Sequence, residues 1–304
     1  MSYSLHKEKK LNASVKKIVT QQIENAVESL QSTRDASSEG IHEARKSFKK
    51  IRAILRLVRP AIKGRYKQGN SIYRSFGHRL SDWRDAKVVI ATLEELQKTF
   101  SERIKMHFFS SARKALEAHF DPVMSDIVRL RITVEELTTS LAEQKKKWGE
   151  MPLTISVDDI TGGAQRTYGK ARKARLVAYE QPSGLNFHQW RKYVKYHWYH
   201  LRLLKDIWPP VMNAFIAQAH SLGDMLGSEH DLTILHDSLT GMDQRQFAPA
   251  DLDILLELID IQQQKLRRQA QGLGIRLFSS TPGDFRQRLS SCIYACQMED
   301  EVRW

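Results

Sequence analysis

Residues 41–60 read IHEARKSFKKIRAILRLVRP, and residues 187–206 read FHQWRKYVKYHWYHLRLLKD. The two stretches are offset by 146 residues, and seven of their twenty aligned positions are identical. The same offset, with no gap, aligns RSFGHRLSDWRD at 74–85 with HSLGDMLGSEHD at 220–231. A single offset that satisfies two separated blocks indicates a duplicated unit, and its period is far longer than that of solenoid repeats.

The hydrophobic pattern around these stretches predicts helices along nearly the whole chain. Apolar residues recur with a period of about 3.6, and no alternating apolar run is long enough to indicate a sheet. The expected helices cover residues 5–32, 41–63, 66–98, 101–119, 122–147, 157–180, 187–206, 210–226, 230–240, 250–272 and 282–298. A break at 148–154 (WGEMPLT) separates the two copies. We therefore expect an all-α fold of two tandem helical bundles, residues 1–147 and 148–304.

Positive charge is concentrated in the first copy. The chain of 304 residues has 48 Lys and Arg against 35 Asp and Glu, a net charge of +13. Residues 1–147 hold 30 basic and 17 acidic residues, whereas residues 148–304 hold 18 of each. An asymmetry of this size points to a polyanionic partner that is attracted mainly by the first copy.

The same composition bears on location. No apolar run approaches the ~18 residues of a membrane span, and the N-terminus lacks the apolar core of a secretory signal. Cys292 and Cys296 cannot form a disulfide framework. These features lead us to expect a cytoplasmic protein with no membrane span.

The repeated helix has two adjacent faces of opposite character. In the first copy, steps of three and four residues give an apolar face of Ile41, Ala44, Phe48, Ile51, Leu55, Val58 and Ile62. A shift of one residue gives the first basic stripe, which comprises His42, Arg45, Lys49, Arg52, Arg56, Arg59 and Lys63. The second copy repeats the apolar face with Phe187, Trp190, Val194, His197, Leu201, Leu204 and Trp208. Its second basic stripe comprises His188, Arg191, Lys195, Trp198, Arg202 and Lys205.

A stripe of like charges favours an anionic ligand over a merely solvated surface. Exposed helices usually mix signs to form pairs at i,i+4, and like charges at that spacing repel. The first stripe is a line of positive charge ~30 Å long. An extended polyanion with regularly spaced charges fits that line better than a compact substrate.

The repeat also contains histidines and acids at matching positions. His42 and His188 open the two stripes, and nearby cations disfavour their protonation. Asp85 and Asp231 occupy equivalent places after the glycine and leucine of each second block. We expect these aspartates to cap a helix or to orient a histidine or an arginine, rather than to take part in catalysis.

The ordered motifs resemble those of the CHAD family, the conserved histidine α-helical domain. The first copy carries His42-x-x-Arg45-Lys46-x-x-Lys49-x-x-Arg52 and then Ser81-x-Trp83-Arg84-Asp85. The second carries His188-x-x-Arg191-Lys192-x-x-Lys195 and then Leu226-Gly227-x-x-x-Asp231. The resemblance covers roughly residues 5–298. It implies two four-helix bundles related by a pseudo-two-fold axis, with a basic surface and central pore.

The resemblance also implies a ligand, inorganic polyphosphate, and association with polyphosphate granules. The phosphate-binding residues it implies are His42, Arg45, Lys46, Lys49, Arg52, Arg56, His188, Arg191, Lys192, Lys195 and Arg202. We expect the corresponding cations Arg59 and Lys205, farther along the two stripes, to bind phosphate as well. The family usually carries an arginine near the position of His197 or Trp198, so the second site is expected to be weaker. No ExExK signature of a triphosphate-tunnel enzyme occurs, which indicates the stand-alone form.

Two other functions stay open from the sequence. Nucleic-acid binding is the first, because the charge allows it and Trp190, Trp198 and Tyr199 offer stacking surfaces in the second copy. Inositol phosphates are a further class of anionic ligand.

A metal-dependent phosphohydrolase is the second, on the basis of His230-Asp231 and His197-x-x-His200. The duplicate of His230 is an arginine, and His197 lies on the apolar face. We therefore expect no catalysis, no metal and no cofactor.

Overall fold

The computed structural model describes residues 3–5, 10–33, 39–102, 107–243, 246–247 and 249–302. These residues form helices and no strands, which confirms the all-α prediction. The helices are α1 (Leu11–Gln31), α2 (Glu39–Leu57), α3 (Arg59–Ile62), α4 (Arg65–Arg79), α5 (Ser81–Phe100), α6 (His107–Met124), α7 (Ile127–Glu150), α8 (Val157–Glu180), α9 (Gly184–Leu203), the 3-10 helix η1 (Lys205–Ile207), α10 (Pro209–Gly241), α11 (Pro249–Leu277) and α12 (Pro282–Val302). In the described part of the chain, none of them combines the length and the apolar character that crossing a membrane requires.

The helices repeat with the same offset as the sequence. Adding 146 to the bounds of α2 gives 185–203, and α9 spans Gly184–Leu203. Adding 146 to those of α1 gives 157–177, where α8 lies. The short α3 likewise corresponds to η1, and α4 with α5 correspond to α10. The duplication is therefore structural as well as sequential.

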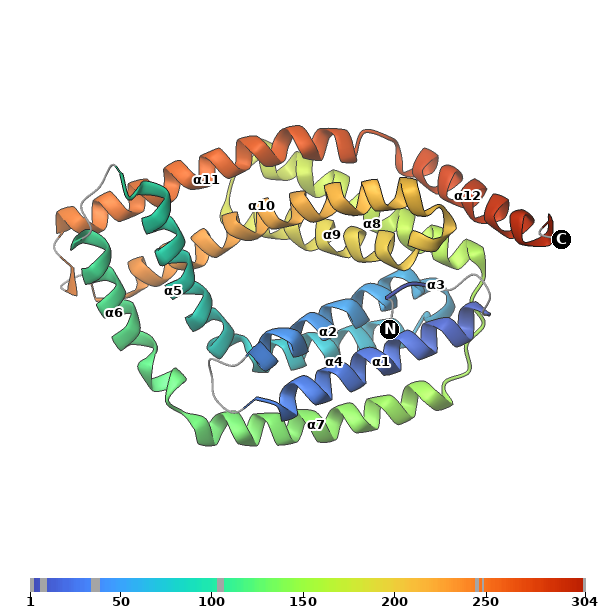
Figure 1. Cartoon of the computed structure of the whole chain (residues 1–304), viewed down its shortest axis with the longest axis horizontal. Coiled ribbons are helices and arrows are strands. Elements are labelled where there is room, and N and C mark those ends of the chain that lie inside the picture. Colours follow the sequence, from blue (N-terminus) through green and yellow to red (C-terminus); the bar gives the residue numbers. More distant parts are fainter. Residues whose placement is uncertain are drawn as a thin grey trace.

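Several predicted helix boundaries are wrong. The expected helix 41–63 ends at Leu57, and the short α3 follows at Arg59. The stretch 66–98 was expected to be one helix, but α4 ends at Arg79 and α5 begins at Ser81. The intervening Leu80 is fully buried and leaves the helical conformation, with φ −104° and ψ 8°. The turn lets α4 pack on α2 while α5 leaves to pack on α6 and α10 (Figure 1).

The opposite error occurs in the second copy. The predicted helices 210–226 and 230–240 form one helix, α10, of 33 residues. Gly227, Ser228 and Glu229 occupy the interval between the two predicted ranges. Packing against α9, α11 and α5 outweighs the ~1 kcal/mol helix penalty of one glycine.

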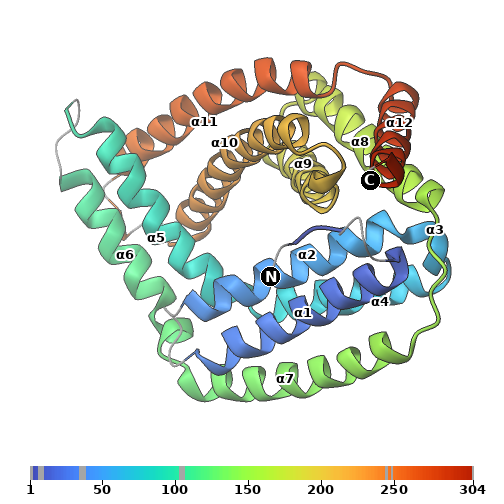
Figure 2. The same cartoon turned by 45° about the vertical axis from the view of Figure 1, so that its right-hand side comes forward.

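The buried side chains gather in two clusters that both draw on the two copies. One contains α1, α2, α4, α7, α8 and α9 together with the first part of α10 and with α12. The other lies between α5, α6, the second part of α10 and α11. Figure 2 shows α5 and α6 reaching from the first copy to α10 and α11 of the second. The division at residue 147 and the count of four helices in each bundle stay predictions.

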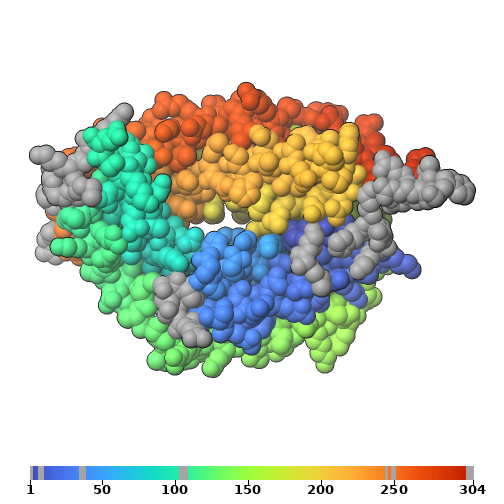
Figure 3. Space-filling model, viewed as in Figure 1, coloured from blue at the N-terminus to red at the C-terminus, as the bar shows by residue number. Residues whose placement is uncertain are grey.

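The face shown in Figure 3 is hollowed at its centre. The opening is bordered by α2, α5 and the pair α9 and α10, which are blue, teal and yellow in that view. All four helices carry segments of the repeated blocks. The repeat therefore surrounds this opening.

Candidate functional site

The apolar faces predicted for the repeated helix are buried. In α2 the residues from Ile41 to Leu55 on this face are at most 2% exposed. In the second copy Trp190 and Val194 are fully buried. Trp208 is the exception, because α9 ends at Leu203 and leaves this tryptophan 51% exposed. Burial of each apolar face turns the adjacent basic stripe toward the border between the two copies.

The two repeated helices meet toward their C-terminal ends. The buried imidazole of His200 on α9 lies 2.9 Å from the carbonyl oxygen of Ala53 on α2, measured from Nε2. Because α2 and α9 pack against each other, the two basic stripes become neighbours. The two stripes lie 146 residues apart in the sequence, and the helical pattern alone gave no indication of this contact.

Five cations from both copies form the central cluster, which we define as Arg45, Lys49, Arg84, Arg191 and Lys195. Lys49 is exposed, yet the protein packed around its ammonium group lowers its pKa to about 7, with further lowering by the other four members of the cluster. Arg84 lies on α5 and was not predicted to contact phosphate. The feature of the sequence that could have identified Arg84 is its position next to Asp85 in the repeated block.

Each conserved aspartate of the repeat faces the arginine of its own copy. Burial raises the pKa of Asp85, and the nearby Arg45 is the strongest influence in the opposite direction. Burial likewise raises the pKa of Asp231, and Arg191 opposes it most. Each aspartate therefore acts electrostatically on the arginine of its own copy, while the capping or orienting role stays a prediction.

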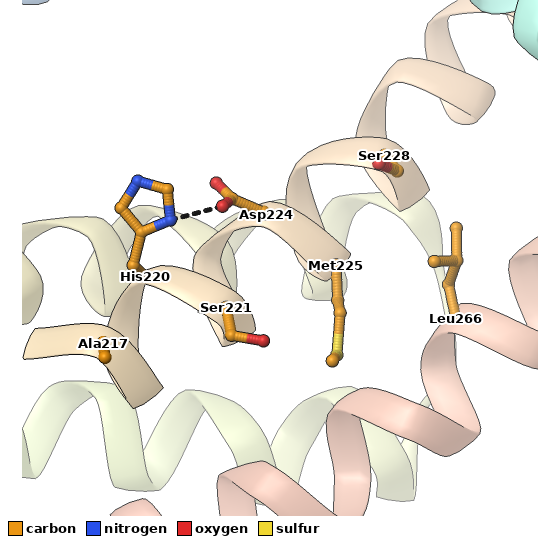
Figure 4. A pocket seen from close by; sticks show the side chains of 7 residues that line it. All are labelled: Ala217, His220, Ser221, Asp224, Met225, Ser228 and Leu266. Carbon is orange, nitrogen blue, oxygen red and sulfur yellow. Dashed lines mark ion pairs between the residues drawn. The ribbon is translucent and has the colours of Figure 1, made fainter. Parts of the chain in front are cut away.

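Lys195 is less available than its counterpart Lys49. Its Nζ lies 3.0 Å from Oδ1 of Asp224, and Asp224 also pairs with His220 (Figure 4). A Cβ at Gly223 would lie 3.1 Å from Cδ of Lys195, so glycine lets this side chain lie against α10. The carboxylate of Asp224 neutralises part of the second stripe, which agrees with the expectation of a weaker second site.

Figure 4 shows a pocket that is lined in part by the pair His220 and Asp224. Its lining is Ala217, His220, Ser221, Asp224, Met225 and Ser228 of α10, with Leu266 of α11. Its acidic group, Asp224, is the one that holds Lys195. The pocket therefore borders the cationic site through that aspartate.

The histidines that open the stripes have depressed pKa values, as expected. Burial and then the positive charge of Arg84 lower the pKa of His42. Burial and then Arg191 lower the pKa of His188 to about 4. The ring of His188 lies 4.1 Å from that of His230, which is the position equivalent to Arg84. Both histidines are therefore neutral at neutral pH.

The other histidines of the phosphohydrolase hypothesis are packed in the protein. His197 is 2% exposed, and its ring lies 5.5 Å from that of Tyr168 and 5.4 Å from that of Phe278. Burial lowers the pKa of His230 to about 3, with further lowering by His188. These contacts give each ring a structural partner.

One group in the described residues has the spacing of metal ligands. Donor atoms of Glu39, His42 and Glu43 lie within 4.8 Å of one another at the start of α2. Lysines already face both carboxylates, because Lys46 lies 2.9 Å from Glu43 and Lys87 lies 4.0 Å from Glu39. Ion pairing is therefore the chemistry that this group displays.

The remaining predicted cations lie on two flanks of the central cluster. On one flank, Lys46 pairs with Glu43, and the guanidinium of Arg202 lies 4.8 Å from the ring centre of Trp198. Lys205, in η1, is half-buried. The other flank holds Arg52, Arg56, Arg59 and Lys192.

On this second flank, aromatic rings and an amide hold the arginines. Arg52 donates to Oδ1 of Asn70 at 3.2 Å, and the guanidinium of Arg56 lies 4.2 Å from the ring centre of Tyr196. The guanidinium of Arg59 lies 4.7 Å from the ring centre of Tyr66. None of these partners carries a negative charge at neutral pH, so the positive charge of the three arginines remains available to a ligand.

Comparison with known proteins finds the same fold elsewhere. The family model described as the CHAD domain matches residues 17–240. The CHAD domain from the plant Ricinus communis has a similar structure, with a TM-score of 0.67, 14% identity, and coverage of 92% of this chain and 95% of that one. PptA from Streptomyces chartreusis is similar with a TM-score of 0.62, 14% identity, and coverage of 87% and 99%. A search of curated proteins finds no match. The chain belongs to the CHAD domain family.

Proposed function

We propose that this protein binds inorganic polyphosphate without hydrolysing it. The observation that carries the proposal is the central cluster, where Lys49 of one copy is surrounded by Arg191 and Lys195 of the other as well as by Arg45 and Arg84. Bringing five cations together costs free energy that a bound polyanion offsets. Polyphosphate suits the site because its charges are regularly spaced along a flexible chain, and Arg and Lys donate charge-assisted hydrogen bonds to phosphate.

The hollow between α2, α5, α9 and α10 offers a place for such a chain (Figure 3). These helices carry all the members of the central cluster and both conserved aspartates. We propose that the cluster lines this opening, and that polyphosphate binding localises the protein to polyphosphate granules.

Nucleic acid is the alternative ligand, and the aromatic residues argue against it. Single-strand binders need exposed rings on which bases stack. Here Trp198 is 7% exposed and Tyr196 is 4% exposed, and both already carry cations on their faces. The rings of Trp198 and Tyr196 therefore contact the protein's own cations and are not free to stack on bases.

The first test is competition for labelled long-chain polyphosphate near physiological salt. We expect polyphosphate to be displaced by unlabelled polyphosphate at concentrations at least a hundredfold lower, per phosphate, than by single-stranded DNA, double-stranded DNA or RNA. Affinity is expected to fall steeply with salt, through release of counterions. Equal competition by the nucleic acids would reduce the site to a general electrostatic surface. Inositol hexakisphosphate, added in a parallel series, tests the compact polyanion.

The same preparation tests for catalysis. Incubation of long-chain polyphosphate with protein and Mg²⁺ or Mn²⁺ is expected to release no phosphate above a protein-free blank. If phosphate is released in a metal-dependent reaction, and if mutation of His230 or Asp231 abolishes that release, these residues carry out the catalysis. Such a result would establish the phosphohydrolase alternative.

The pKa of Lys49 predicts how binding depends on pH. A bound polyanion favours the charged ammonium and raises its pKa above the value of about 7 in the free protein. Affinity is then constant below pH 7 and declines as the pH rises between the two pKa values. We expect a decrease of about tenfold between pH 6.5 and 8.5, the equivalent of ~1.4 kcal/mol. Titrations at several pH values measure it.

Lys49→Arg is the matched control, because arginine stays charged throughout this range. Its affinity is expected to change little with pH beyond the ionisation of the terminal phosphates, which both proteins share. An identical pH profile in the wild type and the variant would show that Lys49 does not titrate in the site.

A further inference from the structure

The end of α2 packs unusually closely against α8. A Cβ at Gly163 would lie 1.8 Å from the carbonyl oxygen of Leu57, so only glycine permits the observed approach of the two backbones. The equivalent position in the first copy is Lys17. The contact is therefore a feature of one side of the molecule and is not repeated by the duplication.

This close contact brings two further cations to the end of the first stripe. Arg166 and Lys170 follow Gly163 by three and seven residues, so they lie on the same face of α8. Both are exposed. The charges of Arg59 and Arg56 act on them across the contact between α2 and α8. Neither residue belongs to the repeated motifs.

Shared tyrosine rings connect the cations of this flank to one another. Tyr196 lies under Arg56 and Arg52, with its ring centre 4.2 and 5.9 Å from their guanidinium carbons. Tyr66 lies under Arg59 and Arg56 at 4.7 and 6.0 Å. Tyr193 lies under Lys192 and Lys170 at 5.3 and 5.7 Å from their ammonium nitrogens. The rings order like charges side by side without neutralising them.

We call these residues the lateral track. It comprises Arg52, Arg56, Arg59, Arg74, Arg166, Lys170 and Lys192. The charges that act most strongly on Lys192 are all positive, and so are those that act on Lys170; together with burial they lower both pKa values. Arg166 has an acidic neighbour, Asp159, whose influence is the smallest of those acting on it.

The opposite flank, related by the internal repeat, lacks the two cations that α8 contributes. The positions equivalent to Arg166 and Lys170 are Thr20 and Glu24. Glu24 pairs with Lys145 at 2.8 Å. The position equivalent to Lys192 is Lys46, whose Nζ lies 2.9 Å from Glu43. Arg202 and Lys205 keep the opposite flank cationic at the positions equivalent to Arg56 and Arg59. The difference between the flanks therefore lies in Arg166, in Lys170 and in Lys192, which forms no ion pair among the described residues.

We propose that a polyphosphate chain bound at the central cluster continues in one direction, over the lateral track and onto α8, so that long chains gain contacts that short ones cannot reach. The proposal rests on the proposed function. From Lys49 to the end of α2 at Leu57 the track adds ~12 Å, at a rise of ~1.5 Å per residue, and Arg59 follows in α3. Pyrophosphate or tripolyphosphate held at the central cluster would not extend that far.

The test is the double variant Arg166→Glu with Lys170→Glu. We expect its affinity for long-chain polyphosphate to fall about 30-fold, because reversing two charges removes two phosphate contacts and repels the chain. Its affinity for tripolyphosphate is expected to change less than threefold. Isothermal titration with both ligands measures the two effects.

The control is Lys265→Glu with Arg268→Glu on α11. Both residues are exposed, and the change in net charge is the same. We expect less than a threefold loss for this variant with either ligand. The neutral pair Arg166→Gln with Lys170→Gln serves if the reversal impairs folding, with an expected loss of about tenfold for long chains.

The outcomes separate the inference from the function on which it rests. Failure of the wild type to bind polyphosphate would overturn the proposed function. Binding by the wild type with no loss in either α8 variant would overturn the lateral track alone. Equal losses of affinity in the α8 and α11 variants would also overturn the track, and so would equal losses for long and short chains. Either result would indicate that affinity depends only on the overall electrostatic field of the protein.

Discussion

Replacing Arg45, Lys49 and Arg52 together with glutamate is expected to abolish polyphosphate binding, with a loss of at least a thousandfold near physiological salt. Two of the three residues belong to the central cluster, and Arg52 begins the lateral track. The variant changes the net charge by six and reverses the local field where the two copies meet. Helicity is expected to persist, because the apolar face of α2 is untouched and buried. Titration with polyphosphate and far-ultraviolet circular dichroism measure the two properties.

The corresponding change in the second copy is expected to have a smaller effect. Replacing Arg191, Lys195 and Arg202 with glutamate also reverses charge at the central cluster, but Lys195 already pairs with Asp224. It also leaves every arginine of the lateral track in place. Equal losses in the two triple variants, or no loss in either, would contradict this ordering. Glutamine triples at the same positions serve as controls for the effect of charge reversal on folding.

Replacing Arg267 with methionine is expected to destabilise the protein by about 3–5 kcal/mol, the cost of leaving a buried charge without its partner. Glu229 on α10 is 1% exposed, and its Oε1 accepts hydrogen bonds from Nε and Nη2 of Arg267 at 3.0 and 2.7 Å. Methionine retains apolar contact with Phe187, over which Arg267 lies. The main effect of the variant is therefore to leave the charge of Glu229 buried without its partner. Urea unfolding, followed by circular dichroism, measures the change.

Two comparisons identify the mechanism of that loss. Glu229→Gln is expected to cost less, because Arg267 is partly accessible and water solvates its charge. Burial raises the pKa of Glu229, and Arg267 is the first influence that opposes this. In Arg267→Met the deficit should shrink as the pH falls toward the pKa of an unfolded glutamate, about 4.3. A deficit that is independent of pH would point to lost packing instead.

The sequence by itself determined the helical character of the protein and the composition of its repeated helices. Helix formation and the separation of apolar from basic faces depend on residues three and four apart, which are neighbours along the chain. The burial of the apolar face from Ile41 to Leu55 and of Trp190 therefore follows from the pattern alone. The duplication and the family resemblance could be recognised from the sequence, because two blocks share one offset.

Only the tertiary structure decided which charges act together. Arg84, Arg166 and Lys170 join the stripes because α5 and α8 pack beside α2, and Gly163 allows the closest of these approaches. Asp224 neutralises Lys195 from another helix. The turn at Leu80 and the continuity of α10 were likewise set by packing partners. Coulomb energy depends on the distance between charges in space. The sequence pattern of one helix therefore does not show which charges the neighbouring helices place beside it.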